Sequence, residues 1–379
     1  MPENIKIHWF ENLRSFMVFL VVVTHVAVTY ERYSMGSEWW IVVDPSNNNF
    51  AGILFLIMNI FVMATIFFIS GFFAPLSLKT KTNKEFIIAK FKRLMIPWSI
   101  AVLTLIPAYK IIFLYSRNMP HEDWTTYFHW SSMWSQNWLW FLPVLFLFNI
   151  VYLIFSKIDT KKIKLGKSIF SALILGLIFS FLMDYFNLHG WTKSIILDFQ
   201  NERLFIYFLV FLVGAQSYKL NTFESSIRNK KIEMISYSIG WIPVTVYIAG
   251  VIYNLVNPDD YLFSKSMDIL IIRLSFLLSL TYLIYSMLIG FKNYVNKKDK
   301  LWKEINRNSY GVYIIHVIIM GIIAIVLIDI EIPSIIKFFS LTISTFVISN
   351  LIICSYKKLK RRLTNYRPIH NNVYKKLPK

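Results

Sequence analysis

Long apolar runs alternate with short polar segments along almost the whole chain. Ten of these runs are long enough to cross a hydrocarbon core of about 30 Å as α-helices. Several contain proline, which membrane helices tolerate where neighbouring helices satisfy the freed carbonyl groups. The pattern predicts an all-α, polytopic membrane protein with about ten transmembrane helices, near residues 11–31, 51–78, 94–116, 137–156, 167–187, 203–219, 233–254, 267–290, 309–328 and 334–355.

Composition supports a membrane location. Of the 379 residues 56% are hydrophobic and only 16% are charged, whereas soluble domains carry about 25% charged residues. The first run could be a signal peptide, but its length and flanking residues favour a retained spanning helix. Cys354 is the only cysteine, which excludes an intramolecular disulfide.

The positive charges give the orientation. The net charge is +19, which by itself suggests nucleic-acid binding. However, 32 of the 40 Lys and Arg residues fall in alternate polar segments, as expected for loops on the cytoplasmic side. We therefore expect both termini in the cytoplasm, a multi-pass protein of the cell membrane, and no nucleic-acid partner. The segments are 1–14, 79–93, 157–167, 219–233, 291–307 and 356–379.

Two regions follow from this arrangement. Residues 1–356 are expected to form one membrane domain, and residues 357–379 a basic cytoplasmic tail. The outer loops are short and rich in tryptophan, including Trp138 and Trp140. Such residues form aromatic belts at membrane interfaces, but they could also stack on sugar rings as a substrate-binding platform. Both interpretations remain open from the sequence.

The first predicted helix carries Arg14 and His25. Eleven residue steps make about three turns plus 20°, so both side chains point the same way, about 16 Å apart along the axis. Arg14 lies at the inner rim, where it could anchor an anion. His25 lies deep in the membrane, where it could act as a base. The alternative is a snorkelling arginine and a histidine bonded to a neighbouring helix.

Further cations close the second inner segment. Lys90 and Arg93 are three residues apart and therefore neighbours on a helical face, and Lys92 lies between them. These groups would suit the phosphates of a cytoplasmic ligand. Taken alone, they are better explained by the positive-inside rule.

Other ionisable or polar residues are weaker candidates. His316 lies a few residues inside the ninth predicted helix, and Tyr313 shares its face, where it is a candidate for substrate binding. Arg203 lies near an outer helix end, where it could bind a sugar or simply anchor the helix. No two of the seven histidines are four residues apart and no His-Glu-x-x-His is present, so we expect no metal site.

Together these pieces resemble the membrane-bound acyltransferase type three family, over nearly the whole chain and in order. One departure is Lys90, where the family has arginine, which keeps the charge but loses a bidentate fork. Within the family, the chain is most similar to the glucans biosynthesis protein C group, whose members add succinyl groups to glucans. The segments that resemble the family are Arg14–ten residues–His25, Phe-Phe-Ile-Ser-Gly-Phe at 67–72, Lys90-x-x-Arg93, Trp-Leu-Trp-Phe-Leu at 138–142 and Ser-Tyr-Gly-Val-Tyr-Ile-Ile-His at 309–316. Those similar to the glucans biosynthesis protein C group are Trp-Phe-Glu-Asn-Leu-Arg at 9–14 and Ser-Gly-Phe-Phe at 70–73 with the downstream Ile-Pro at 96–97.

The resemblance implies transfer of an acyl group, acetyl or succinyl, from cytoplasmic acyl-CoA to a hydroxyl of an extracytoplasmic glycan or lipid-linked sugar. Arg14, Lys90, Lys92 and Arg93 would then bind the donor. His25 or His316 would be the base or a covalent acyl carrier, and the sequence does not decide between these roles. The competing interpretation is a transporter or flippase, which would often show two related halves; the sequence shows none.

Overall fold

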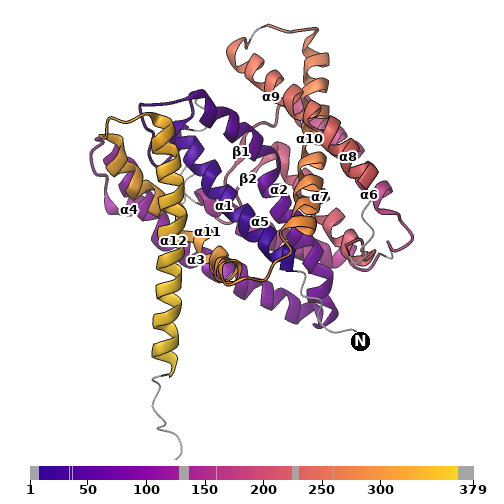
Figure 1. The fold of residues 1–379 in the computed structure, drawn as a ribbon, viewed down its shortest axis with the longest axis horizontal. Coiled ribbons are helices and arrows are strands. Elements are labelled where there is room, and N and C mark those ends of the chain that lie inside the picture. Colours follow the sequence, from indigo (N-terminus) through magenta and orange to yellow (C-terminus); the bar gives the residue numbers. More distant parts are fainter. Residues whose placement is uncertain are drawn as a thin grey trace, which may run out of the picture.

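The computed structural model describes residues 8–33, 35, 37–127, 136–158, 160–223, 230–258 and 260–365. This part of the chain is almost entirely helical (Figure 1). A short antiparallel ribbon, in which Trp191 pairs with Gln200, connects two helices. The elements are α1 His8–Tyr30, η1 Ser37–Trp39, α2 Asn49–Lys79, α3 Asn83–Ser116, α4 Trp124–Tyr127, η2 Asn137–Trp140, α5 Phe141–Phe155, α6 Leu165–Tyr185, β1 Trp191–Thr192, β2 Phe199–Gln200, α7 Asn201–Lys219, α8 Lys230–Ile239, α9 Trp241–Val256, α10 Lys265–Tyr294, α11 Lys300–Ile328 and α12 Ser334–Asn365.

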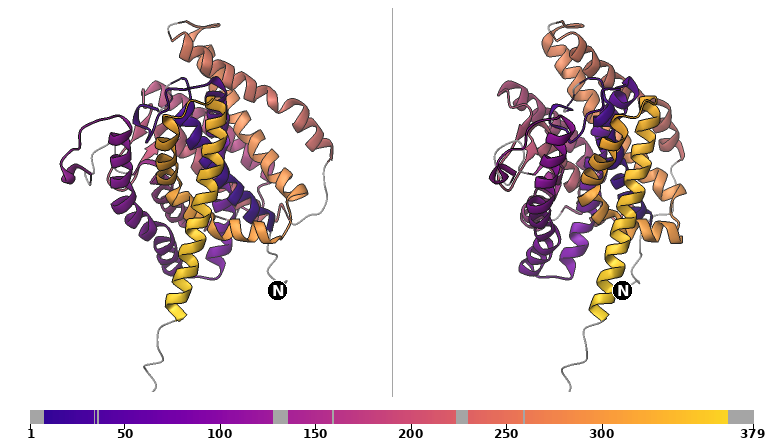
Figure 2. Two further views of the ribbon diagram at one scale, coloured as in Figure 1. Left: turned by 60° about the vertical axis from the view of Figure 1, so that its left-hand side comes forward. Right: turned by 90° about the vertical axis from the view of Figure 1, so that its left-hand side faces the viewer.

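The expected all-α, polytopic membrane fold is confirmed. Within the described ranges, nine helical segments are long and apolar enough to cross a membrane, with α8 and α9 contributing one of them jointly. The remaining expected span, at 203–219, is α7, whose first turn carries Glu202 and Arg203. The start of α1 and the end of α12 lie on the same side of the molecule (Figures 1 and 2). We call this side the inner side.

Three helices extend beyond their apolar runs on the inner side. α3 begins at Asn83, after a capping box formed by Thr82 and Glu85, which satisfies backbone donors at the helix start. Lys90, Lys92 and Arg93 therefore lie on a helix. α11 begins at Lys300. α12 continues through the first part of the basic tail to Asn365, and the rest of that tail lies outside the described residues.

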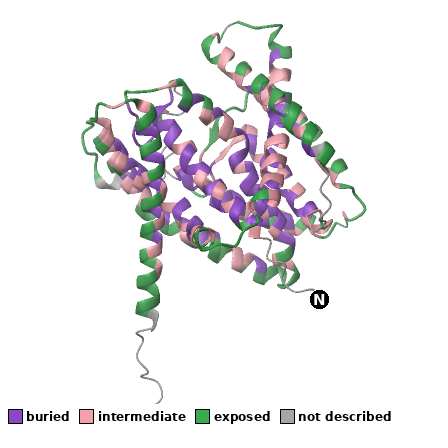
Figure 3. Ribbon diagram, viewed as in Figure 1, coloured by how far each residue is buried: buried purple, intermediate pink, exposed green. Residues whose placement is uncertain are grey.

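α1 is the central helix. Of its most apolar stretch 72% is buried inside the protein, against 11% for α6 and 6% for the α8–α9 segment. α1 packs against α2, α10, α11 and α12. Buried residues cluster around it, whereas α6, α8, α9 and α12 present exposed faces (Figure 3). Lipid must cover those faces, and side chains of α1 are held by neighbours on several sides.

Two glycines allow α2 and α7 to touch. A Cβ atom on Gly71 would lie 2.0 Å from the carbonyl oxygen of Phe211, and one on Gly214 would lie 2.2 Å from that of Phe68. Small residues at helix crossings permit this approach of two backbones in membranes. The Phe-Phe-Ile-Ser-Gly-Phe segment at 67–72 therefore packs α2 closely against α7.

Candidate functional site

A pair of histidines joins α1 to α11 in the membrane interior. Nδ1 of His25 lies 2.7 Å from Nε2 of His316. The two rings are nearly parallel, with an interplanar angle of 4°. His316 is fully buried, whereas His25 is half-buried. The structure thus brings together the two histidines that the sequence offered as separate candidates.

Hydrogen-bond partners assign the proton positions of the neutral pair. Nδ1 of His316 lies 2.7 Å from the carbonyl oxygen of Tyr313 and 3.2 Å from that of Val312. Carbonyl oxygens only accept, so this nitrogen carries a proton, and Nε2 of a neutral His316 must accept. The proton between the rings is therefore donated by Nδ1 of His25. Nε2 of His25 then holds a free lone pair, as a base requires.

Trp40 covers His25 on the outer side. Its ring centroid lies 4.9 Å from that of His25, and its Nε1 donates to the hydroxyl of Thr29 over 3.2 Å. The carbonyl oxygen of Trp40 accepts from Arg117 at 2.8 Å. Thr29 bonds the ring of Trp40 and Arg117 bonds its backbone. The ring so held restricts the space and the access of water around His25.

The segment Ser309–His316 fastens α11 to three different elements. The hydroxyl of Tyr310 donates to the carbonyl oxygen of Arg93 in α3 over 2.7 Å. The hydroxyl of Tyr313 donates to the carbonyl oxygen of Trp138 in η2 over 2.6 Å. His316 bonds α1. These residues are spaced by three and lie along one side of α11, where α3, η2 and α1 each meet one of them. Together the three bonds fix the position of His316.

Trp138 and Tyr313 are tied to each other rather than turned to a cavity. Nε1 of Trp138 donates to the carbonyl oxygen of Ile314 over 3.0 Å, and both side chains are buried. Trp140 is half-buried and lies edge-on to the exposed ring of Trp191. Among the tryptophans singled out by sequence, Trp140 therefore has the more accessible ring.

The inner end of α1 is fixed by Asn12. Its Nδ2 donates to the carbonyl oxygens of Val295 and Lys297 at 2.8 and 3.0 Å. Its Oδ1 accepts from Asn306 of α11 at 2.7 Å. Because α1 is bonded at this level to the segment after α10 and to α11, and to α11 again at His25, its rotation is fixed over the stretch that separates Arg14 from His25.

Cationic groups gather beside this end of α1. Arg93 acts electrostatically on both Arg14 and Lys90. The buried Nε of Arg14 has no hydrogen-bond partner among the described residues. Lys92 and Arg93 are exposed, whereas Lys90 and Arg14 are half-buried. Like charges repel, so such a cluster is suited to an anionic ligand.

A comparison with known families agrees with this arrangement. The model of a family described as "Acyltransferase domain", the acyltransferase type three family, matches residues 7–354. The chain belongs to this family. No curated protein and no solved structure matches it. The resemblance to the family is confirmed, and the protein is a membrane acyltransferase. The similarity to the glucans biosynthesis protein C group stays a prediction.

Cations elsewhere in this acyltransferase have protein partners. Arg203 is buried, donates to the carbonyl oxygen of Asn59 over 3.2 Å and stacks on Phe276. Lys110 donates to Glu122 over 2.6 Å, and hydrogen bonds from Lys110 and then Thr126 lower the pKa of the Glu122 carboxyl. Two further pairs are Arg273 with Asp184 and Lys337 with Asp44. These cations therefore help to hold helices and outer loops together.

Two residues of the candidate site were missed by sequence reasoning. Nothing in the position of Trp40 along the chain points to His25, and the sequence suggests no role for Asn12. A buried amide beside Arg14 was a usable signal, since a polar side chain in a membrane helix needs partners.

Proposed function

We propose that the protein is an integral membrane O-acyltransferase that moves an acetyl or succinyl group from cytoplasmic acyl-CoA to a hydroxyl of an extracytoplasmic glycan or lipid-linked sugar. The single observation that carries this proposal is the bond between His25 and His316. It orients a lone pair on His25 in the membrane interior. Family membership supports acyl transfer, and the basic inner side supports a cytoplasmic, anionic donor.

The donor would bind at the inner end of α1. Coenzyme A carries phosphates, and Arg14, Lys90 and Arg93 would pair with them, with Lys92 adding charge at the surface. Arg14 and His25 lie on one face of α1, about 16 Å apart. The long, thin pantetheine arm would follow that face and bring the thioester to His25.

The chemistry requires one base. The acceptor hydroxyl would give its proton to Nε2 of His25 while its oxygen attacks the thioester carbonyl carbon. The new C–O bond forms as the C–S bond breaks, and the proton ends on the coenzyme A thiolate. During transfer His25 carries a positive charge, which it could share with His316 by moving its Nδ1 proton to Nε2 of that ring. The carbonyl oxygens of Tyr313 and Val312 would stabilise His316 in its charged form.

A covalent route uses the same nitrogen. Nε2 of His25 would attack the thioester and carry the acyl group before the acceptor arrives. We favour direct transfer, because base catalysis needs only one placed group. Trp140, with its accessible ring on the outer side, is the leading element for stacking on an acceptor sugar. Roles in acceptor binding for Trp138, Tyr313 and Arg203 stay predictions.

The proposal is tested by transfer of labelled acyl groups in proteoliposomes. Purified protein is given acetyl-CoA or succinyl-CoA with candidate glycans or lipid-linked sugars, and the product ester is measured. The expected result is ester formation that stops in the His25→Ala protein. Ester formation that is unchanged by His25→Ala, or that draws on a donor without coenzyme A, would overturn the proposal.

A further inference from the structure

A second feature of the molecule lies away from the histidine pair. A cavity of about 540 Å³ is lined mainly by residues of α2, α6, α7, α8 and α10. No residue of α1 or α11 lines it. Its volume is in the range of ligand pockets. The cavity therefore belongs to a different part of the protein from the proposed transfer site.

The cavity extends from the inner side into the membrane domain. Its lining along α10 extends from Leu277 to Asn293, close to the inner end of that helix. This stretch covers about 24 Å by the helical rise, most of a hydrocarbon core of about 30 Å. On the facing side, α6 contributes from its first turn at Leu165 onwards.

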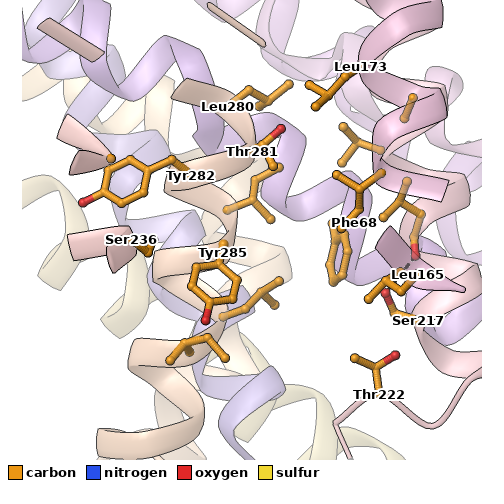
Figure 4. A pocket seen from close by; sticks show the side chains of 18 of the residues that line it. Phe68, Leu165, Leu173, Ser217, Thr222, Ser236, Leu280, Thr281, Tyr282 and Tyr285 are labelled. Atoms are coloured by element: carbon orange, nitrogen blue, oxygen red, sulfur yellow. Dashed lines mark hydrogen bonds between the residues drawn. The ribbon is translucent and has the colours of Figure 1, made fainter. Parts of the chain in front are cut away.

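The charged side chains of the lining lie at one end. Leu173 and Leu280 lie together at one end, whereas Ser217 and Thr222 lie at the other (Figure 4). The polar end also includes Glu233, Lys292 and Asn293, and the Nδ2 of Asn293 donates to Glu233 over 3.3 Å. This end is at the inner side, where α7 ends and α8 begins. The cavity thus changes from charged at the inner surface to apolar in the interior. A lipid with its head group at the inner surface has the same polarity profile.

The surrounding helices leave a side for a lipid to enter. Within the described residues, α6 packs against α7 and α10, whereas α8 packs against α9 and α10. Within the same residues, α6 and α8 do not pack extensively against each other, which leaves the cavity open between them. Both helices expose large apolar side chains to the bilayer, among them Ile174 and Ile235. An apolar cavity that meets hydrocarbon is filled by an acyl chain at little cost, because no polar group must be desolvated.

We propose that this cavity binds an acyl chain of a zwitterionic phospholipid from the inner leaflet, with phosphatidylethanolamine as the fitting head group. Lys292 would meet the phosphate and Glu233 the ammonium group, so one positive and one negative side chain complement the two charges of the head group. The chain would extend past Thr281 towards Leu173. The lipid site is distinct from the acyl-CoA site and does not depend on it.

Photo-crosslinking tests the proposal directly. The full-length protein is reconstituted with phosphatidylethanolamine that carries a diazirine in one acyl chain, illuminated, digested and mapped by mass spectrometry. We expect labelled peptides from α6, α7 and the inner half of α10 well above those from the lipid-exposed α9 and α12. Labelling spread evenly over all lipid-exposed helices would overturn the proposal. So would stronger labelling by phosphatidylglycerol or by a long-chain acyl-CoA probe.

Cavity-filling variants supply matched controls. Ile169→Trp fills the cavity from α6 and Thr281→Trp from α10, and each should reduce crosslinking there several-fold. Ile174→Trp and Leu274→Trp place the same ring on exposed faces of the same two helices, outside the cavity, and should leave crosslinking unchanged. If filling and control variants label alike while their size-exclusion profiles match wild type, no lipid occupies this cavity. The two filling variants lie on opposite walls, so the test still stands if one of them misfolds. Mapping of the wild-type protein tests the proposal without any variant.

Discussion

His25 and His316 are separated by 291 positions in the chain, yet Nδ1 of one ring lies 2.7 Å from Nε2 of the other. The carbonyl oxygens beside Nδ1 of His316 fix the direction of the shared proton. The two histidines are therefore not interchangeable. His25 presents the free nitrogen, and His316 positions it.

The first prediction follows from that asymmetry. His25→Ala should lower kcat by about 10²–10⁴-fold, the usual contribution of a placed general base. Binding of acyl-CoA should change little, because Arg14 lies three helical turns away. Single-turnover kinetics and a separate donor-binding assay check this. Near wild-type turnover in a folded His25→Ala protein would transfer the role of base to His316.

His316 should respond to the kind of replacement. In His316→Gln a side-chain oxygen can still accept from Nδ1 of His25, so the ring stays oriented and part of the activity should survive. His316→Ala leaves that donor unpaired in a buried place and should be clearly less active. The comparison uses kcat in both variants with KM for the donor as control. Equal activity of the two variants would contradict a positioning role.

A second prediction concerns the donor. Lys90→Ala with Arg93→Ala should raise the KM for acyl-CoA far more than that for the acceptor, because each charge-assisted contact is worth about 1.5–3 kcal/mol. The control removes two other inner charges, Lys162→Ala with Lys164→Ala, and should leave donor KM unchanged. An equal rise in donor KM in both double variants would mean that Lys90 and Arg93 act only through the general positive charge of the inner surface.

Arg14→Lys tests the geometry of the same site. The charge remains but the planar fork is lost. Donor binding should weaken, while the pH profile of kcat keeps its shape because His25 and His316 are untouched. Isothermal titration with acyl-CoA and a pH series measure the two quantities. A changed pH profile would mean that Arg14 acts on the histidine pair.

A third prediction tests the crossing of α2 and α7. Gly71→Ala places a methyl group about where the carbonyl oxygen of Phe211 lies, so the helices must separate. Overpacking of this kind costs about 1–3 kcal/mol or more, and a clear fall in melting temperature is expected. Gly290→Ala is the control, since a Cβ there meets nothing within 4 Å and alanine favours the helix. Similar melting of both variants would disprove the tight contact.

A fourth prediction concerns orientation. Single cysteines introduced at Lys84, Lys161 or Lys303 in a Cys354→Ser background should react with a membrane-impermeant maleimide only after the cell is opened, because these segments carry the positive excess. A cysteine at Asn187 is the outer control and should react in intact cells. Labelling of the inner positions in sealed cells would reverse the topology and the side of the donor.

A fifth prediction concerns pH. Hydrogen bonds from Lys110 and Thr126 lower the pKa of Glu122, so the contact stabilises the folded protein at pH above the usual carboxyl pKa and is lost as pH falls through the lowered value. Because Glu122 is exposed, the effect is small, on the order of a degree or two in melting temperature. Glu122→Gln should remove this acid-dependent step. A step that persists in Glu122→Gln would assign it to another carboxyl group.

The sequence by itself determined the class of the fold and much of its outline. Apolar runs longer than a bilayer is thick permit little besides spanning helices, since backbone groups in lipid must bond within their own helix. The position of lysine and arginine adds an expected orientation. Helical spacing also placed Arg14 and His25 on one face. Both lie on one helix, so their relative direction can be predicted without knowing which helices pack against it.

Only the tertiary structure decided which residues of different helices meet. Sequence could list His25 and His316 but not join them, because their contact depends on the packing of α1 beside α11. The same holds for Trp40 over His25, and for Asn12 bonding a distant loop. Lipid is as apolar as the helices, so hydrophobic burial does not specify the partner helix. Close approaches such as Gly71 with Phe211 and hydrogen bonds between helices do so, and these exist only once the chain is folded.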